Sequence, residues 1–119
     1  MVVVLATIMV IMARPSVQDT VSITNLLSDK ILIVHCRSKD DDLGDHGVAI
    51  GDSFSWSFEP NVFGGTLFWC NLAVEDKRIS FKAYEEYEET FGKWFVHDDG
   101  LYGKPDRFPI FKMAAWTGP

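Results

Sequence analysis

Short segments in which apolar and polar residues alternate run through most of this chain, and they constrain its fold more than any other feature. The clearest lies at residues 53–58, SFSWSF. In an extended strand Phe54, Trp56 and Phe58 would share one side, and the three serines would share the other. We therefore predict that the aromatic side of this strand faces a core and that the serine side faces water.

Similar alternation recurs between clusters of Asp, Asn, Gly and Pro, which favour turns. It predicts strands at residues 21–27, 30–36, 53–58, 66–74, 79–84, 93–97 and 107–113, and a shorter pattern at 46–50 would add one more. No amphipathic helical period separates these segments, so an antiparallel arrangement is favoured over a parallel α/β sheet. The sequence thus predicts an all-β fold, a small antiparallel β-sandwich of about seven to eight strands.

The N-terminal segment is apolar from Val2 to Ala13 apart from Thr7, and the first charged side chain is Arg14. A run of this length fits the hydrophobic region of a secretory signal better than a membrane span of about 20 residues. We predict a signal peptide at residues 1–13, with an end near residue 18 as a variant, followed by a single domain at residues 19–119. The alternative is a buried first strand rich in Val and Ile.

The chain contains two cysteines, Cys36 and Cys70. In the oxidising compartment that a secretory signal implies, one pair of cysteines predicts one disulfide. Strand alternation places each sulfur on the apolar side of its strand, so we expect this disulfide to lie in the core. Neither sulfur would then be free to act as a nucleophile or a metal ligand.

Residues 34–47, VHCRSKDDDLGDHG, concentrate histidines and aspartates as metal and catalytic sites do. The calcium-loop pattern fails, because the sixth and twelfth positions counted from Asp40 are Asp45 and Gly51 instead of Gly and Glu. The histidines, His35 and His46, have no recognised zinc-ligand spacing. We therefore interpret residues 40–46 as a charged loop that leaves the strand of Cys36, and we predict no metal site.

Other function classes are disfavoured as well. A net charge of -6 and the absence of a basic patch argue against a nucleic-acid partner. The nucleophilic serine of a Gly-x-Ser-x-Gly elbow is missing from the sequence. Asp98 and Asp99 precede Gly100, and this sequence is typical of a tight turn. We predict no catalytic residue and no cofactor.

Four segments occur in a distinctive order from about Val21 to Tyr102: VSITNLL, HCRSKDDDLG, GDSFSWSFEPNVFGGTLFWC and WFVHDDGLY. In this order they resemble the plant self-incompatibility protein S1 family, also called the S-protein homologues. The resemblance implies a small secreted β-sandwich with a core disulfide. The best-known members are stigma ligands that meet a pollen membrane receptor and provoke calcium signalling and rejection of self pollen. Many members carry an additional cysteine pair, which this chain lacks.

On this basis we predict a secreted, extracellular signalling ligand that binds a cell-surface receptor protein through exposed loops. We expect a monomer that is not an enzyme, and whose mature chain does not insert into a membrane. The alternative is a secreted hydrolase or small-molecule-binding sandwich protein with an aromatic-lined pocket. Such a pocket would draw on some of Trp56, Trp69, Trp94 and Trp116.

Two acidic segments, residues 40–46 and 85–90, are the predicted partner-binding loops. Together they hold eight of the seventeen acidic residues, and a negative surface of this kind favours a basic partner. The alternative is that these charges only keep a β protein soluble and its edges unpaired. The candidate contact residues are Asp40, Asp41, Asp42, Asp45, Glu85, Glu86, Tyr87, Glu88 and Glu89.

Overall fold

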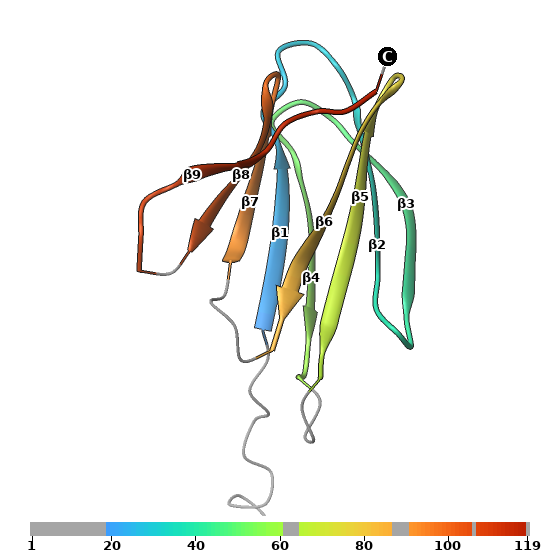
Figure 1. The fold of residues 1–119 in the computed structure, drawn as a ribbon. Coiled ribbons are helices and arrows are strands. Elements are labelled where there is room, and N and C mark those ends of the chain that lie inside the picture. Colours follow the sequence, from blue (N-terminus) through green and yellow to red (C-terminus); the bar gives the residue numbers. More distant parts are fainter. Residues whose placement is uncertain (1–18, 61–64, 87–90, 106, 119) are drawn as a thin grey trace, which may run out of the picture.

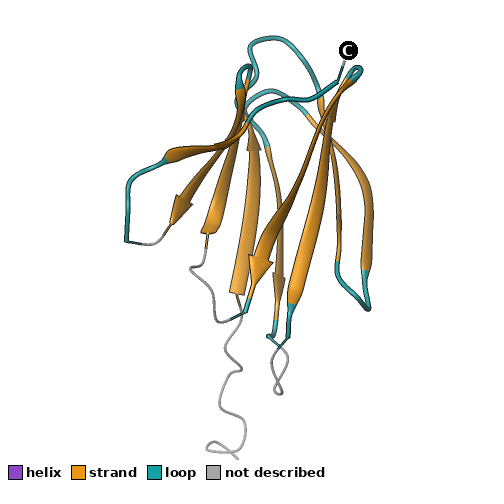
Figure 2. Cartoon of the chain, viewed as in Figure 1, coloured by secondary structure: helices purple, strands orange, loops and turns teal. Residues whose placement is uncertain are grey.

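The computed structural model describes residues 19–60, 65–86, 91–105 and 107–118. These residues form strands and connecting loops, without a helix (Figure 2). The strands are β1 (Asp19–Asn25), β2 (Leu32–Arg37), β3 (Asp42–Val48), β4 (Ser53–Phe58), β5 (Leu67–Val74), β6 (Lys77–Glu85), β7 (Phe91–His97), β8 (Gly100–Pro105) and β9 (Phe111–Ala114). The predicted signal peptide and its alternative, a first strand, lie outside the described residues. Within the described part of the chain, no helix is long and apolar enough to span a membrane.

The strands form two sheets that face each other (Figure 1). One sheet has the order β4-β1-β7-β8-β9, and the other has the order β3-β2-β5-β6. The prediction of an all-β sandwich is confirmed. Its antiparallel character holds for every named pair except β1 and β7, which run parallel.

Two strands differ from the prediction: the pattern at residues 46–50 covers only the end of β3, and β8 was not predicted. Residues 40–46 were expected to be a loop, but β3 begins at Asp42 and pairs with β2 through His35 and Asp45. Likewise β8 follows the predicted turn at Asp98 and Asp99 and fills the gap between β7 and β9. Both strands contain Gly together with Asp or Pro, which have low strand propensity. Pairing with neighbouring strands outweighs that propensity.

The C-terminal strand is shorter than predicted. Residues 107–113 were expected to be a strand, but β9 begins only at Phe111. Because β9 is the outermost strand of its sheet and lies away from the opposite sheet in Figure 1, its apolar side chains are poorly covered. Phe108, Ile110, Phe111 and Met113 are all between 42% and 57% exposed.

The core lies between the sheets and contains the predicted disulfide. Cys36 and Cys70 occupy directly paired positions on β2 and β5, with their Cα atoms 4.0 Å apart, and both are buried. The strand alternation therefore placed the sulfurs on the correct side. Largely buried around them are Val21, Ile23, Leu32, Val34, Leu72, Val96 and Leu101.

The β4 strand has the predicted faces. Its serines are exposed, while Phe54, Trp56 and Phe58 are half-buried and pack against the core. The ring of Phe68 on β5 lies 5.5 Å from that of Trp56 and 4.7 Å from that of Phe58. The aromatic side of β4 thus joins the two sheets, although β4 lies at a sheet edge and its rings keep partial exposure.

Candidate functional site

The first predicted acidic segment and the described start of the second, Glu85 and Glu86, lie at the same end of the sandwich. In the four-stranded sheet, β2 and β6 lie on either side of β5, so the β2–β3 turn, the start of β5 and the end of β6 are neighbours (Figure 1). The Glu86 amide donates a hydrogen bond to the Thr66 carbonyl at 2.9 Å, which fixes the end of β6 beside the start of β5. We call this region the acidic end, and define it by Asp40, Asp41, Asp42, Glu59, Glu85 and Glu86.

A hollow of about 620 Å³ opens at the acidic end between the β2–β3 turn and the start of β5. Asp40, Asp41 and Glu59 contribute carboxylates to it, and Trp69 contributes an indole that is 45% exposed. Exposed tryptophans beside charged groups are frequent anchors of protein interfaces. The full lining is Ser38, Lys39, Asp40, Asp41, Phe58, Glu59, Gly65, Thr66, Leu67, Phe68 and Trp69.

The β2–β3 turn is held by local hydrogen bonds. The Ser38 amide donates to the Asp41 carbonyl at 2.7 Å, and the Asp41 amide donates to the Ser38 hydroxyl at 3.1 Å. Asp40 and Asp41 are consequently presented to solvent on an ordered turn. An ordered turn loses less conformational entropy on binding than a flexible loop does.

The other two predicted aspartates of this segment have a different setting. Asp42 and Asp45 flank His35 on the outer face of the four-stranded sheet. Nε2 of His35 lies 2.5 Å from Asp42 Oδ1, and its Nδ1 lies 2.8 Å from Asp45 Oδ1. These carboxylates hold the imidazole and connect β2 to β3, while their side chains remain 63% and 75% exposed.

Asp42 is also held by the backbone. Its Oδ1 accepts a hydrogen bond from the Gly44 amide at 2.9 Å, within β3, where Gly44 has a φ of 78° that glycine adopts without strain. This amide, and then the hydrogen bond to His35, lower the pKa of Asp42 below its usual value. The carboxylate thus stays ionised to a lower pH than a free aspartate would.

The second predicted segment is described only as far as Glu86. Glu85 pairs with Lys82, while the carboxylate oxygens of Glu86 are covered and have no hydrogen-bond partner among the described residues. Beside them, the Tyr84 hydroxyl donates to Asp19 Oδ2 at 2.5 Å. Burial, followed by Asp19, raises the pKa of Tyr84. The other predicted contacts, Tyr87, Glu88 and Glu89, lie outside the described residues.

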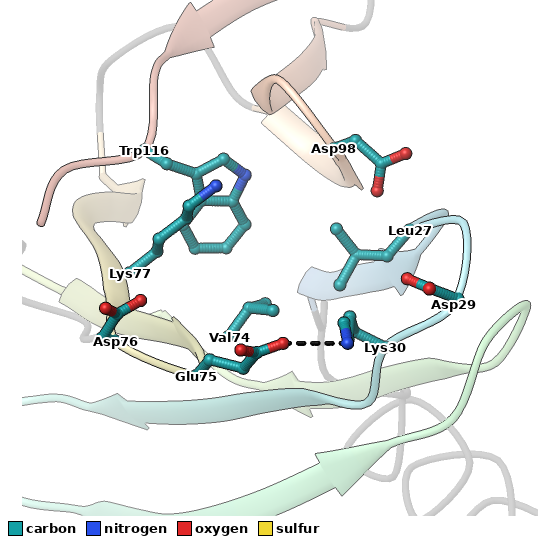
Figure 3. Close-up of a pocket in the computed structure, with 9 residues that line it drawn as sticks. All are labelled: Leu27, Asp29, Lys30, Val74, Glu75, Asp76, Lys77, Asp98 and Trp116. Carbon is teal, nitrogen blue, oxygen red and sulfur yellow. Dashed lines mark ion pairs between the residues drawn. The ribbon is translucent and has the colours of Figure 1, made fainter. Parts of the chain in front are cut away.

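The opposite end of the sandwich carries a smaller hollow of about 280 Å³ (Figure 3). Lys30 Nζ lies 3.0 Å from Glu75 Oε1, and this contact raises the pKa of Lys30. Trp116 forms part of the wall, and its Nε1 donates to the His97 carbonyl at 3.1 Å. The lining is Leu27, Asp29, Lys30, Val74, Glu75, Asp76, Lys77, Asp98 and Trp116, which includes no histidine.

The four tryptophans do not converge on one pocket. Trp69 and Trp116 lie at opposite ends, Trp94 is buried with its Nε1 donating to the Ala83 carbonyl at 3.2 Å, and Trp56 packs against the core. Each of these two hollows therefore has one tryptophan in its lining, and the larger one also has Phe58 and Phe68. In the parts of the chain that the structure describes, no group of three or more His, Cys, Asp or Glu residues is placed to hold a metal ion.

Sequence reasoning found the acidic turn but missed Trp69 and Glu59 as its neighbours. Trp69 lies between Phe68 and Cys70, both buried, so its outward direction could have been read from strand parity. The position of Glu59 depends on how β4 and β5 approach the β2–β3 turn, and no pattern in the sequence around Glu59 predicts that arrangement.

Comparison with known proteins adds independent evidence. The family model described as plant self-incompatibility protein S1 matches residues 20–116. S-protein homolog 21 of Arabidopsis thaliana is 34% identical over 110 residues, which cover 83% of this chain and 83% of that protein. S-protein homolog 2 of the same plant is 38% identical over 79 residues, 66% of this chain and 49% of that protein. Self-incompatibility protein S1 of Papaver rhoeas is 33% identical over 87 residues, 67% of this chain and 63% of that protein.

The chain therefore spans most of one of these relatives, but only about half to two thirds of the other two. No solved structure matches the chain.

Proposed function

The chain belongs to the plant self-incompatibility protein S1 family, and from this membership we propose that it is a secreted signalling ligand that binds a protein on a cell surface. The family match carries the proposal, because it covers residues 20–116 and so nearly all of the described domain. A ligand of this kind acts by occupying its receptor, and the proposed role requires neither catalysis nor a cofactor. We propose that it acts as a monomer.

The acidic end is the surface that we propose contacts the receptor. Asp40 and Asp41 stand on an ordered turn, and Trp69 offers an exposed ring beside them. Carboxylates would steer a basic receptor surface toward the ligand and accelerate association, whereas a desolvated tryptophan would slow dissociation. Asp42 and Asp45 would support this surface indirectly by holding His35 and β3.

The end of β6 would extend the same surface. The carboxylate oxygens of Glu86 are covered by the protein, so Glu86 would contribute to this surface through its negative charge rather than through a direct contact. Glu85, Tyr87, Glu88 and Glu89 remain proposed contacts on the basis of the sequence, Tyr87 as an aromatic anchor among carboxylates.

The proposal is tested by binding of the labelled, disulfide-bonded protein to intact plant cells. We expect saturable binding that unlabelled protein competes away and that mild protease treatment of the cells removes. Reduced and alkylated protein, which lacks the native disulfide, serves as a control and should not bind if binding requires the native fold. Binding that never saturates, or that survives complete removal of surface proteins, would exclude a cell-surface protein as the receptor.

A further inference from the structure

The outer face of the five-stranded sheet carries rows of hydroxyl groups. Three side chains of β1 face three serines of β4 in directly paired positions: Thr20 and Ser57, Ser22 and Ser55, Thr24 and Ser53. The outer two pairs are hydrogen-bonded through their hydroxyl oxygens, at 2.7 Å and 2.6 Å. For the middle pair, the side chains of Ser22 and Ser55, no hydrogen bond is found within the described ranges, so these hydroxyls are available to a ligand.

Two lysines continue the row of this middle pair. Ser22 on β1 pairs in register with Lys93 on β7, and Lys93 is directly opposite Lys104 on β8. Like charges in directly opposite positions of a sheet destabilise it unless something neutralises them. The cross-strand arrangement therefore concentrates positive charge at one point of a chain whose net charge is -6.

The two ammonium groups differ in their contacts. Lys104 Nζ donates to the carbonyls of Pro105 at 3.1 Å and Phe108 at 3.0 Å, and an ammonium group has three N–H donors, so one is left. For Lys93, neither a hydrogen bond nor an ion pair is found within the described part of the chain. Both side chains can thus donate to an additional acceptor.

These groups border a hollow of about 340 Å³, which we call the lysine hollow. Its lining contains no carboxylate: it consists of Thr20, Ser22, Gly92, Lys93 and Lys104. At Gly92 the two backbones approach closely, since a Cβ atom there would contact the Thr20 carbonyl oxygen at 3.4 Å. The volume lies at the lower end of the range of small-ligand sites.

We propose that the lysine hollow binds the acidic group of an anionic saccharide. The carboxylate of a uronic acid unit would accept charge-assisted hydrogen bonds from Lys93 and Lys104, and its charge would relieve the repulsion between them. The sugar hydroxyls would bond to Ser22 and Ser55. The two other hydroxyl pairs of β1 and β4 lie one on each side of Ser22 and Ser55, roughly 7 Å away, which is the rise of two strand residues. A sugar chain could contact these pairs as well as the hollow, whereas a free anion could contact only the hollow.

This inference is independent of the proposed receptor, since none of these residues belongs to the acidic end. Its test is calorimetric titration of the disulfide-bonded protein at low salt with oligogalacturonate, with its fully methyl-esterified form, and with inorganic phosphate. We expect the acidic oligomer to bind, the neutral ester to bind much more weakly, and the double variant Lys93→Gln, Lys104→Gln to lose at least about tenfold in affinity. The control Lys77→Gln, which removes a lysine at the far end, should bind like the parent.

Thermal unfolding of each variant checks that its fold is intact, and the double variant should be no less stable than the parent without ligand because like charges are removed. The proposal is overturned if the double variant keeps the parent affinity, or if ester and acid bind equally. If phosphate bound as tightly as the oligomer, the site would recognise an anion alone and the saccharide proposal would be wrong. Binding to anionic lipid vesicles but not to the oligomer would identify a membrane surface instead.

Discussion

Asn25 shows how a single buried polar side chain organises this fold. It is fully buried, and its Nδ2 donates to the carbonyls of Lys30 and Val48, both at 2.9 Å, while its Oδ1 accepts from the Leu27 amide at 2.8 Å. One side chain therefore satisfies three backbone groups, which belong to the loop after β1 and to the end of β3. Such groups are costly when buried without partners.

We predict that Asn25→Ala destabilises the protein by about 1–3 kcal/mol for each backbone group that stays buried and unpaired. Chemical denaturation measures the free energy of unfolding, and Thr24→Ala, which changes an exposed hydroxyl on the same strand, is the control. Equal stabilities of the two variants would show that the loop satisfies its backbone without Asn25.

At Asp42 the structure predicts a dependence on pH. Because the folded-state pKa of Asp42 is lowered, its ionised form contributes stability above the unfolded pKa of about 3.9, and this contribution is lost as the pH falls through the lower folded pKa. Asp42→Asn should therefore be less stable than the parent at neutral pH, and the difference should shrink in acid. Denaturation at both pH values measures it, and a difference that does not change with pH would contradict the assignment.

Trp56 tests which face of β4 packs against the core. Trp56→Ala removes a half-buried ring that contacts Phe54 and Phe68, and should cost about 3 kcal/mol, near the lower end for such changes. Ser55→Ala, on the opposite face, should change stability by less than about 0.5 kcal/mol. Denaturant midpoints of the two variants compare them directly, and equal midpoints would mean that the face assignment is wrong.

At the scale of elements, alternation predicted the strands that have one apolar side. β4 and β5 follow this rule, since their apolar residues alternate with exposed ones. Most of β3 and all of β8 could not be found in this way, because DLGDHGV and GLYGKP contain turn-forming residues and little alternation. Their strand conformation comes from hydrogen bonding to β2 and β7, which is a tertiary effect.

The parallel pairing of β1 with β7 is a second tertiary effect. Ser22 pairs with Lys93 although about seventy residues separate them, and nothing local to either segment encodes that direction. The same pairing creates the lysine hollow, so that site could not have been predicted from sequence motifs. In contrast, the disulfide was predictable because the chain offers only one pair of cysteines.

The disulfide ties β2 to β5 in the middle of the four-stranded sheet. We predict that replacing both cysteines with alanine lowers the free energy of unfolding by about 2–5 kcal/mol, because the bond closes a long loop in the unfolded chain. Intact mass with and without reductant, combined with denaturation, measures this effect. Free thiols in protein from a secretory host, or an unchanged stability, would contradict a structural role for the bond.

At the scale of the whole molecule, the two ends of the sandwich offer different chemistry. The acidic end combines Asp40 and Asp41 with the exposed ring of Trp69, while the hollow at the opposite end mixes four carboxylates with two lysines, one of which, Lys30, pairs with Glu75. The sequence predicted the acidic turn from its composition. It did not predict that Trp69 lies beside that turn, since their proximity arises from the order of strands in the sheet.

The central claim is that the acidic end contacts a basic receptor surface, and the most direct measurement is the association rate of the labelled protein with intact plant cells. Two double variants with the same net charge compare the two ends. One combines Asp40→Lys and Asp41→Lys at the acidic end, and the other combines Asp29→Lys and Asp76→Lys in the opposite hollow. Exposed charges contribute little to stability, so both variants should fold. We predict that the first variant associates more slowly than the parent and loses its salt dependence, while the second associates like the parent. Parent-like association of the first variant, or slowing of the second alone, would contradict the claim.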